Sequence, residues 1–287
     1  MAAVGLALTS ALLFGAMSVG LRIGLSRHPH VEVATLATVG GALAVALVAA
    51  AAEVPARGVH ASAAWPFLLA GILQPGVGQM LVTLAIREAG ASRASVVFGV
   101  APLVSVTIAL LALGEPVSAA LIVGAVLIVG GGFELARERN RPEHLRLIGL
   151  FYAFLVTVLF STRDNLIRWL AKNGNATPPG VAAAAALLGG SVVVLAVLGP
   201  RVKRAAWRDV APFLGVGVLF GLSYVSLFEA FYRGRVTVVS PLVATESLWG
   251  VGLSLLLLRH TELVGRRIVI GALLIVAGGA LIGAHAG

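Results

Sequence analysis

Long stretches without charged residues recur through this chain and decide what it can fold into. Each has roughly the 20 residues that an α-helix needs to cross about 30 Å of hydrocarbon. A helix satisfies its own backbone hydrogen bonds in lipid, and these stretches are too continuously apolar for the strands of a membrane barrel. The sequence therefore predicts an all-α integral membrane protein with ten transmembrane helices. The ten segments are Met1–Leu21, Val33–Ala52, Ala61–Ile86, Ala94–Leu113, Val117–Phe133, Leu147–Thr162, Thr177–Pro200, Val210–Phe228, Val236–Leu258 and Ile268–Ala284.

Composition supports the same class of protein. The 287 residues are 59% hydrophobic and 11% charged, whereas a soluble domain carries about 25% charge. Cysteine is absent, which excludes disulfides, thiolate metal sites and a cysteine nucleophile. The net charge of +9 is typical of basic loops between membrane spans. We expect the lipid bilayer, and no nucleic acid, as a partner.

A nine-residue phrase occurs twice. GAVLIVGGG spans residues 124–132 and GALLIVAGG spans residues 271–279, with seven of the nine letters identical. Other pairs keep nearly the same offset: Gly71 with Gly217, Gly40-Gly41 with Gly189-Gly190, and Arg22 with Arg168. A repeat of about half the chain length, in membrane-helix residues, is typical of internally duplicated transporters.

The longest polar break lies at the middle of the chain and divides it into two sets of five spans. We predict a first five-helix repeat at residues 1–136, a basic linker loop at 137–146 and a second repeat at 147–287. Because five is odd, the second copy must enter the membrane upside down, which makes the two copies an inverted repeat. Fifteen of the 21 Lys and Arg residues fall in loops opposite the N-terminus. The positive-inside rule then predicts that both termini lie outside the cytoplasm.

The repeat motifs resemble a known family. Glu115, Gly124 and Gly131 have the same spacing as Glu262, Gly271 and Gly278, and an aromatic–small pair occurs within the first span of each copy (Phe14-Gly15 and Phe160-Ser161). This pattern resembles the EamA-domain branch of the drug/metabolite transporter superfamily. The resemblance implies a secondary transporter in a cell membrane (plasma or inner), since members are mostly exporters of amino acids, other metabolites or toxic compounds. They are driven by a proton gradient or by exchange. The proline usual in the fourth and ninth spans is kept at Pro102 and replaced by Ser247.

Charged residues at membrane depth are the first functional candidates, because a charge at a helix centre costs roughly 2.5–3.5 kcal/mol to insert. Glu246 lies near the middle of its span and is our candidate for binding a proton or another cation; a structural acceptor role is the alternative. Arg163, Asp164 and Asn165 follow one another late in the sixth span. Successive residues point about 100° apart on a helix, so we expect Asp164 to pair with Arg168 four residues on. Arg163 would then be free to bind Glu246 or a substrate carboxylate, or else to reach the headgroups.

Uncharged polar and aromatic groups form a second set. Pro75 should kink the third span at Gln74, because it lacks an amide hydrogen and its ring clashes with the preceding turn. A carbonyl freed beside the Gln74 amide is typical of broken-helix binding sites, and Gln79 follows on another face of the same helix. Tyr224 and Trp249 lie at middle depths, where they could stack on a substrate or merely pack. Kinks and buried aromatics also serve packing alone.

Three classes of function remain open from the sequence. The first is a secondary transporter, an exporter or exchanger of small metabolites such as amino acids or amphiphilic compounds, with protons as a coupling ion. The second is an intramembrane enzyme acting on a lipid or isoprenoid substrate, and the third is a structural or receptor protein. No metalloprotease, hydrolase, dinucleotide or Walker A motif is present in the sequence, so we expect no catalytic residues, no metal and no cofactor. The small residues of the fifth and tenth spans should buttress the structure or form a homodimer.

Overall fold

The computed structural model describes residues 2–57, 61–113, 119–136, 146–173, 177–202, 206–234, 236–258 and 263–285. Within these ranges the chain forms helices and no strand. The first half comprises α1 (Ala2–Arg27), α2 (Val31–Arg57), α3 (Ala61–Gly71), η1 (Ile72–Val77), α4 (Gly78–Ala89), α5 (Ala91–Phe98), α6 (Ala101–Leu113) and α7 (Ala119–Ala136). The second half comprises α8 (Leu147–Lys172), α9 (Pro179–Leu198), η2 (Gly199–Arg201), α10 (Trp207–Arg233), α11 (Val236–Val243), α12 (Glu246–Leu257) and α13 (Arg266–His285).

Seven helical stretches of the described chain are long and apolar enough to cross a membrane. They are Ala2–Arg27, Val31–Pro55, Ala63–Ala89, Leu147–Lys172, Pro179–Arg201, Trp207–Arg233 and Val238–Leu257. Two shorter apolar helices, Ala91–Ser105 and Ile122–Leu135, fall where the fourth and fifth spans are predicted. The helical membrane architecture is therefore clear from length and composition. Glu115, Glu262 and most of the predicted linker lie outside the described residues.

The predicted kink in the third span is confirmed. Between α3 and α4 the chain forms the wider turn η1, and Gln74 leaves the helical region with φ −145° and ψ 116°. Pro75 cannot donate to the preceding turn, which explains where the helix deforms. The kinked turn packs against α9, where a methyl group on Gly190 would come within 2.5 Å of the Pro75 ring. This glycine permits the close approach.

The fourth and ninth predicted spans are each broken into two helices. The first break lies at Gly99-Val100 between α5 and α6, and Pro102 accounts for it because it cannot donate to the Phe98 carbonyl. The second break lies between α11 and α12. It forms although Ser247 replaces the proline that is expected in this span. Both the amide and the hydroxyl of Ser247 donate to the Ala244 carbonyl, at 3.2 and 2.9 Å, and close a tight turn. A methyl group on Gly99 would meet Ser247 at 3.0 Å, so the two breaks lie in contact.

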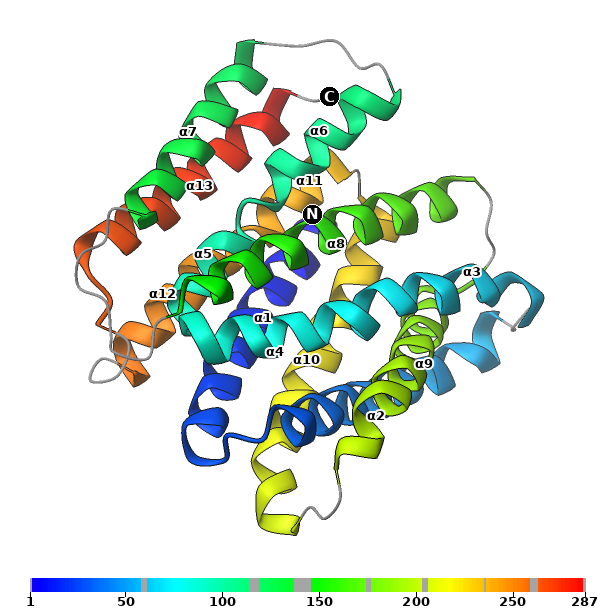
Figure 1. Cartoon of the computed structure of the whole chain (residues 1–287). Helices are drawn as coiled ribbons and strands as arrows, with labels where there is room; N and C mark the ends of the chain where they lie inside the picture. Colours follow the sequence, from blue (N-terminus) through cyan, green and yellow to red (C-terminus); the bar gives the residue numbers. More distant parts are fainter. Residues whose placement is uncertain are drawn as a thin grey trace.

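The twice-occurring phrase forms the contact between α7 and α13, which lie side by side in Figure 1. Gly124 approaches Gly278, and Gly131 approaches Gly271. Each glycine of one phrase therefore meets the opposite end of the other phrase, so the two helices run antiparallel. These small residues let the backbones approach closely. The contact is within one chain and corresponds to the predicted buttress; a homodimer through these helices stays a prediction.

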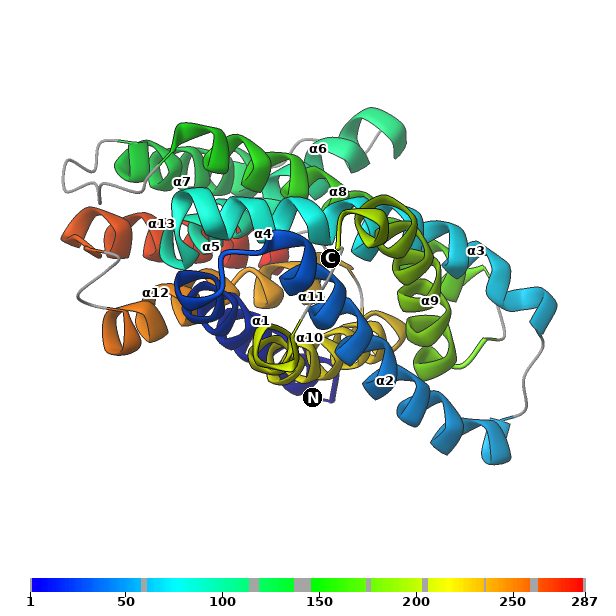
Figure 2. The ribbon, with the colours of Figure 1, turned by 60° about the horizontal axis from the view of Figure 1, so that its bottom comes forward.

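The other paired glycines also join the two halves. Gly41 of α2 packs on Gly217 of α10, where a methyl group would lie 3.1 Å from the Gly217 Cα. The corresponding contact joins α3 to α9, where Gly71 packs on the Ala186 carbonyl and Gly189 packs on the Leu68 carbonyl. Figure 2 shows α2 and α9 on the side of the molecule away from α7 and α13. Corresponding glycines thus serve corresponding contacts in the two halves.

Arg22 and Arg168 also repeat one contact. Arg22 Nη1 donates to the Arg87 carbonyl in the last turn of α4, and Arg168 Nη1 donates to the Phe231 carbonyl near the end of α10, each at 3.1 Å. A cation at a helix C-terminus satisfies carbonyls that lack an intrahelical partner. The predicted pairing of Arg168 with Asp164 is therefore wrong, because the guanidinium of Arg168 is directed to another helix.

The outer face of α7 is apolar, with Ile122, Val126 and Phe133 more than half exposed.

Candidate functional site: a central cavity between the two halves

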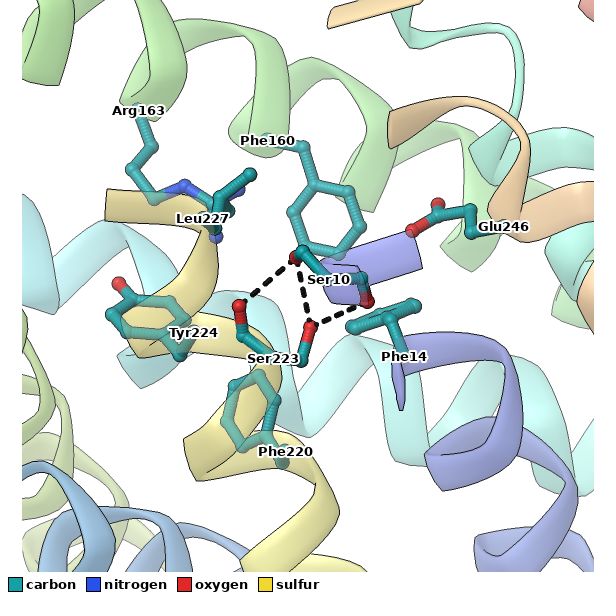
Figure 3. Close-up of a pocket in the computed structure, with 9 residues that line it drawn as sticks. All are labelled: Ser10, Phe14, Phe160, Arg163, Phe220, Ser223, Tyr224, Leu227 and Glu246. Carbon is teal, nitrogen blue, oxygen red and sulfur yellow. Dashed lines mark hydrogen bonds between the residues drawn. The ribbon is translucent and has the colours of Figure 1, made fainter. Parts of the chain in front are cut away.

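A small cavity lies where α1, α8, α10 and α12 meet (Figure 3). Its volume is about 20 Å³, which is room for roughly one water molecule. The cavity is therefore too small for any metabolite in this conformation. Its lining combines phenyl rings with hydroxyl and charged groups: Ser10, Phe14, Phe160, Arg163, Phe220, Ser223, Tyr224, Leu227 and Glu246.

Aromatic rings form one wall of the cavity. The ring of Phe14 packs edge-on against those of Phe160 and Phe220, with centroids 5.6 and 6.4 Å apart, and also meets Phe98 of α5. Such edge-to-face pairs fix ring orientation beyond the effect of area burial. Phe14 and Phe160 are the aromatic residues of the two first-span pairs, so corresponding positions of the two halves meet at the centre.

Arg163 and Asp164 form a buried ion pair beside the cavity. Both side chains are about 5% exposed, and Nε and Nη2 of Arg163 donate to the same Asp164 oxygen at 2.9 and 2.7 Å. The expectation that Arg163 is left free by an Asp164–Arg168 pair is wrong, because the long side chain of Arg163 reaches the neighbouring carboxylate. A buried carboxylate without a partner would be costly, which favours this conformation. Arg163 is paired here and does not contact Glu246.

The guanidinium of Arg163 also lies against two rings. Its Cζ atom is 5.1 Å from the centroid of Phe160 and 5.3 Å from that of Tyr224. These distances fall within the range in which a cation is attracted to a ring face. The two rings therefore help to hold Arg163 in place, and a change in the packing of Tyr224 would alter the position of Arg163 directly.

Glu246 is the first residue of α12 and follows the break in the ninth span. Its side chain is buried, with 4% exposed, and its carboxylate points toward Phe160 and Phe14 (Figure 3). The first turn of a helix favours a negative charge, and a broken helix presents such a terminus at membrane depth. Glu246 of α12 and Arg163 of α8 thus line the same cavity from different helices.

The kink in the third span reaches this site through Tyr224. The Tyr224 hydroxyl donates to the Gln74 carbonyl at 2.8 Å, which satisfies the carbonyl at the deformed turn. The side-chain amides of Gln74 and Gln79 are buried and have no hydrogen-bond partner among the described residues. Neither amide lines the cavity in this conformation.

Two other candidates lie outside the lining. The Asn165 amide donates to the Ser161 carbonyl of its own helix at 2.8 Å. Trp249 is 42% exposed and packs its Cβ near Gly15 of α1.

Six lining residues were not among the sequence candidates: Ser10, Phe14, Phe160, Phe220, Ser223 and Leu227. Four-residue spacing connects Ser10 to Phe14. On α10 the residues Phe220, Ser223, Tyr224 and Leu227 follow the i, i+3, i+4, i+7 spacing of one helical face. That spacing shows that the four residues share one face of α10, but it does not show which other helices this face contacts. The sequence therefore could not predict that these residues line the cavity.

These features define a polytopic helical membrane protein whose two halves meet at a small internal cavity lined in part by charged groups. The chain belongs to the EamA-like transporter family, whose model matches residues 1–135 and again residues 147–284. The family is one of membrane transporters within the drug/metabolite transporter superfamily. A solved crystal structure of a protein is similar to the present one with a TM-score of 0.66 and 22% sequence identity, over 97% of this chain and 95% of that chain. This likeness concerns the fold. No curated protein sequence matches the chain.

Proposed function

We propose that this protein is a secondary active transporter that moves small metabolites through the central cavity by alternating access. The observation that carries the proposal is the small cavity at the contact of two similar halves, with Glu246 and the Arg163–Asp164 pair beside it. Charged groups at membrane depth are costly and mark solute or ion pathways. Alternating access requires a site that the two halves can expose to each side in turn.

The proposed topology is ten crossings in two inverted five-helix repeats, covering residues 1–136 and 147–287. The antiparallel contact of α7 with α13 supports this arrangement, since corresponding glycines exchange places across it. The matched contacts of Arg22 and Arg168 support it from the opposite ends of the bundle. We place the protein in the plasma or inner membrane with both termini outside the cytoplasm, as the distribution of Lys and Arg predicts.

Glu246 is the proposed coupling residue. A buried carboxylate at a helix break can bind a proton or a cationic group and release it when the site opens. Arg163 and Tyr224 are the proposed solute contacts, and Asp164 holds Arg163 in place. Gln74 acts through the hydroxyl of Tyr224, whereas Gln79, Asn165 and Trp249 would contact solute only after the helices move.

The lining fits a small solute with both charged and apolar parts. Arg163 and Glu246 offer opposite charges, Ser10 and Ser223 offer hydroxyl groups, and the rings of Phe14, Phe160 and Phe220 offer an apolar surface. An amino acid or a small amphiphilic compound has this combination. We propose export or exchange of such compounds.

Counterflow in proteoliposomes tests transport without assuming a coupling ion. A panel of amino acids and amphiphilic amines is first screened by thermal shift on the purified protein. Vesicles are then loaded with each stabilising compound and offered the labelled form outside. We expect transient labelled uptake that requires both the protein and the internal compound. Uptake equal to that of protein-free vesicles for every stabilising compound would contradict the proposal.

A further inference from the structure

A stripe of buried polar residues runs from the level of the cavity toward the end of α4. It is built from Ser18 and Arg22 of α1, Thr35 and Thr38 of α2, and Gln79 and Thr83 of α4, which we call the polar seam. Each side chain is at most 9% exposed. Within each helix the two residues are three or four positions apart, so they share one face. Helix α4 packs against both α1 and α2 (Figure 2).

Hydrogen bonds join these stripes into one seam. The Thr35 hydroxyl shares its proton between the Val31 carbonyl of its own helix at 2.8 Å and Thr83 Oγ1 at 3.1 Å. Thr83 Oγ1 donates to the Gln79 carbonyl at 2.9 Å. Arg22 reaches the Arg87 carbonyl one turn beyond Thr83. At the inner end, Ser18 follows the cavity residue Phe14 by one turn of α1. The seam therefore begins beside the cavity and ends at the last turn of α4.

The inner part of the seam has polar atoms that the protein does not satisfy. The hydroxyls of Ser18 and Thr38 and both amide atoms of Gln79 have no hydrogen-bond partner in the described part of the chain, and all three side chains are fully buried. Buried polar groups are almost always hydrogen-bonded, and an unsatisfied group within a bilayer costs several kcal/mol. Water or a polar solute is the partner that such a site takes.

The second half of the chain has a cluster of buried aromatic residues around α10. There Phe228 of α10 packs on Tyr224 and on Phe67 of α3, with ring centroids 4.9 and 6.2 Å apart. Phe231, whose carbonyl accepts the hydrogen bond from Arg168, is also fully buried. Aromatic rings therefore pack around α10, whereas the polar seam lies between α1, α2 and α4.

We propose that the polar seam is the hydrated half of the permeation path, through which water and solutes that both donate and accept hydrogen bonds move between the cavity and the end of α4. The bond from Arg22 to the Arg87 carbonyl closes this path when α4 packs on α1. The inference rests on the proposed transport function. It adds which side of the cavity is wetted and which residues line the route.

Single cysteines in the seam test the proposal, because the natural chain has none. The variants are Thr83→Cys and Thr38→Cys in the full-length protein, reconstituted in vesicles. The probe is a small, positively charged, membrane-impermeant methanethiosulfonate. The control is Val82→Cys, on the same helix as Thr83 and equally buried but in an apolar environment. Buried cysteines in apolar surroundings react poorly, so we expect seam cysteines to react at least about tenfold faster than the control.

Two results would overturn the inference. Equal reaction of Val82→Cys and the seam variants would mean that the helix opens generally, without a specific route. Failure of both seam variants to react, while the same variants still catalyse counterflow, would place the route elsewhere and leave the transport function intact. Arg22→Gln should further raise the reaction rate of Thr83→Cys, since it removes the closing contact; an unchanged rate would exclude that role for Arg22.

Discussion

Gly131 and Gly271 each stand where the other's backbone leaves no room for a side chain. A methyl group on Gly131 would lie 2.6 Å from the Gly271 carbonyl oxygen, and one on Gly271 would lie 2.8 Å from the Gly131 carbonyl oxygen. The two residues belong to opposite ends of the repeated phrase. Their contact therefore relates the two halves of the chain, because it matches the contact of Gly124 with Gly278.

Substituting Gly131 by alanine should destabilise the protein, because backbone atoms of α13 would have to move. We expect a loss of about 1–3 kcal/mol, typical of overpacking. Gly132→Ala is the matched control, since nothing lies within 4 Å of its added methyl group. It should be neutral or stabilise by up to about 1 kcal/mol through helix propensity. Equal unfolding midpoints of the two variants in detergent would contradict the close α7–α13 contact.

The Arg163–Asp164 pair predicts strong non-additivity. Arg163→Met leaves the Asp164 carboxylate buried without its partner, and we expect a loss of about 3–5 kcal/mol in stability. The double variant Arg163→Met/Asp164→Leu should recover much of that loss, because no unpaired charge remains. Unfolding of the purified single and double variants measures both effects. A double variant no more stable than Arg163→Met would show that the pair is not coupled as described.

Tyr224→Phe isolates the hydroxyl that satisfies the kink. The ring that packs on Phe220 and Phe228 stays, but the Gln74 carbonyl loses its donor. We expect a stability loss of about 0.5–1.5 kcal/mol and slower counterflow, since the kinked turn is no longer tied to α10. Tyr152→Phe, a partly buried tyrosine on α8, is the control for loss of a tyrosine hydroxyl elsewhere. The same loss in both variants would exclude a specific role for the Gln74 contact.

Ser10 and Ser223 join α1 to α10 at the cavity through mutual side-chain-to-backbone bonds of 2.9 Å (Figure 3). Interhelical hydrogen bonds in membrane proteins average about 0.6 kcal/mol. Ser10→Ala and Ser223→Ala should therefore each lower the stability by about this amount, because each removes one hydroxyl donor and leaves the partner's backbone carbonyl in place. Unfolding of the two single variants in detergent measures both losses, and two variants as stable as the wild type would contradict a stabilising role for these bonds.

The helical membrane class and the duplication could be predicted from the sequence, because apolar length and spacing are local or periodic properties. The kink at Gln74 was also predictable, since Pro75 acts on its own turn. The break before Glu246 was not, because Ser247 replaces the expected proline and closes the turn by its hydroxyl. The Arg163–Asp164 pair was missed for another reason. The angle between successive residues on a helix fixes the direction of each Cα–Cβ bond, but it does not fix the position of the guanidinium at the end of a long arginine side chain.

The members of the candidate site were only partly predictable. Tyr224, Arg163 and Glu246 attract attention because polar groups are rare at membrane depth. Ser10, Phe14 and Leu227 resemble ordinary membrane-helix residues, and only the contacts of α1 with α10 and α12 place them at the cavity. Which distant helices bury a given residue cannot be predicted from the residues next to it in the sequence.

The central claim is that solute and coupling ion use the cavity beside Glu246. Its most direct test is counterflow and pH-gradient-driven flux of a stabilising compound, measured in proteoliposomes for the wild type, Glu246→Gln and Glu229→Gln. Glu229 is the control, since it is a glutamate paired with Arg233 near the end of α10. We predict that Glu246→Gln abolishes stimulation by the pH gradient and that Glu229→Gln retains it. Gradient-driven flux in Glu246→Gln equal to that of the wild type would contradict the account.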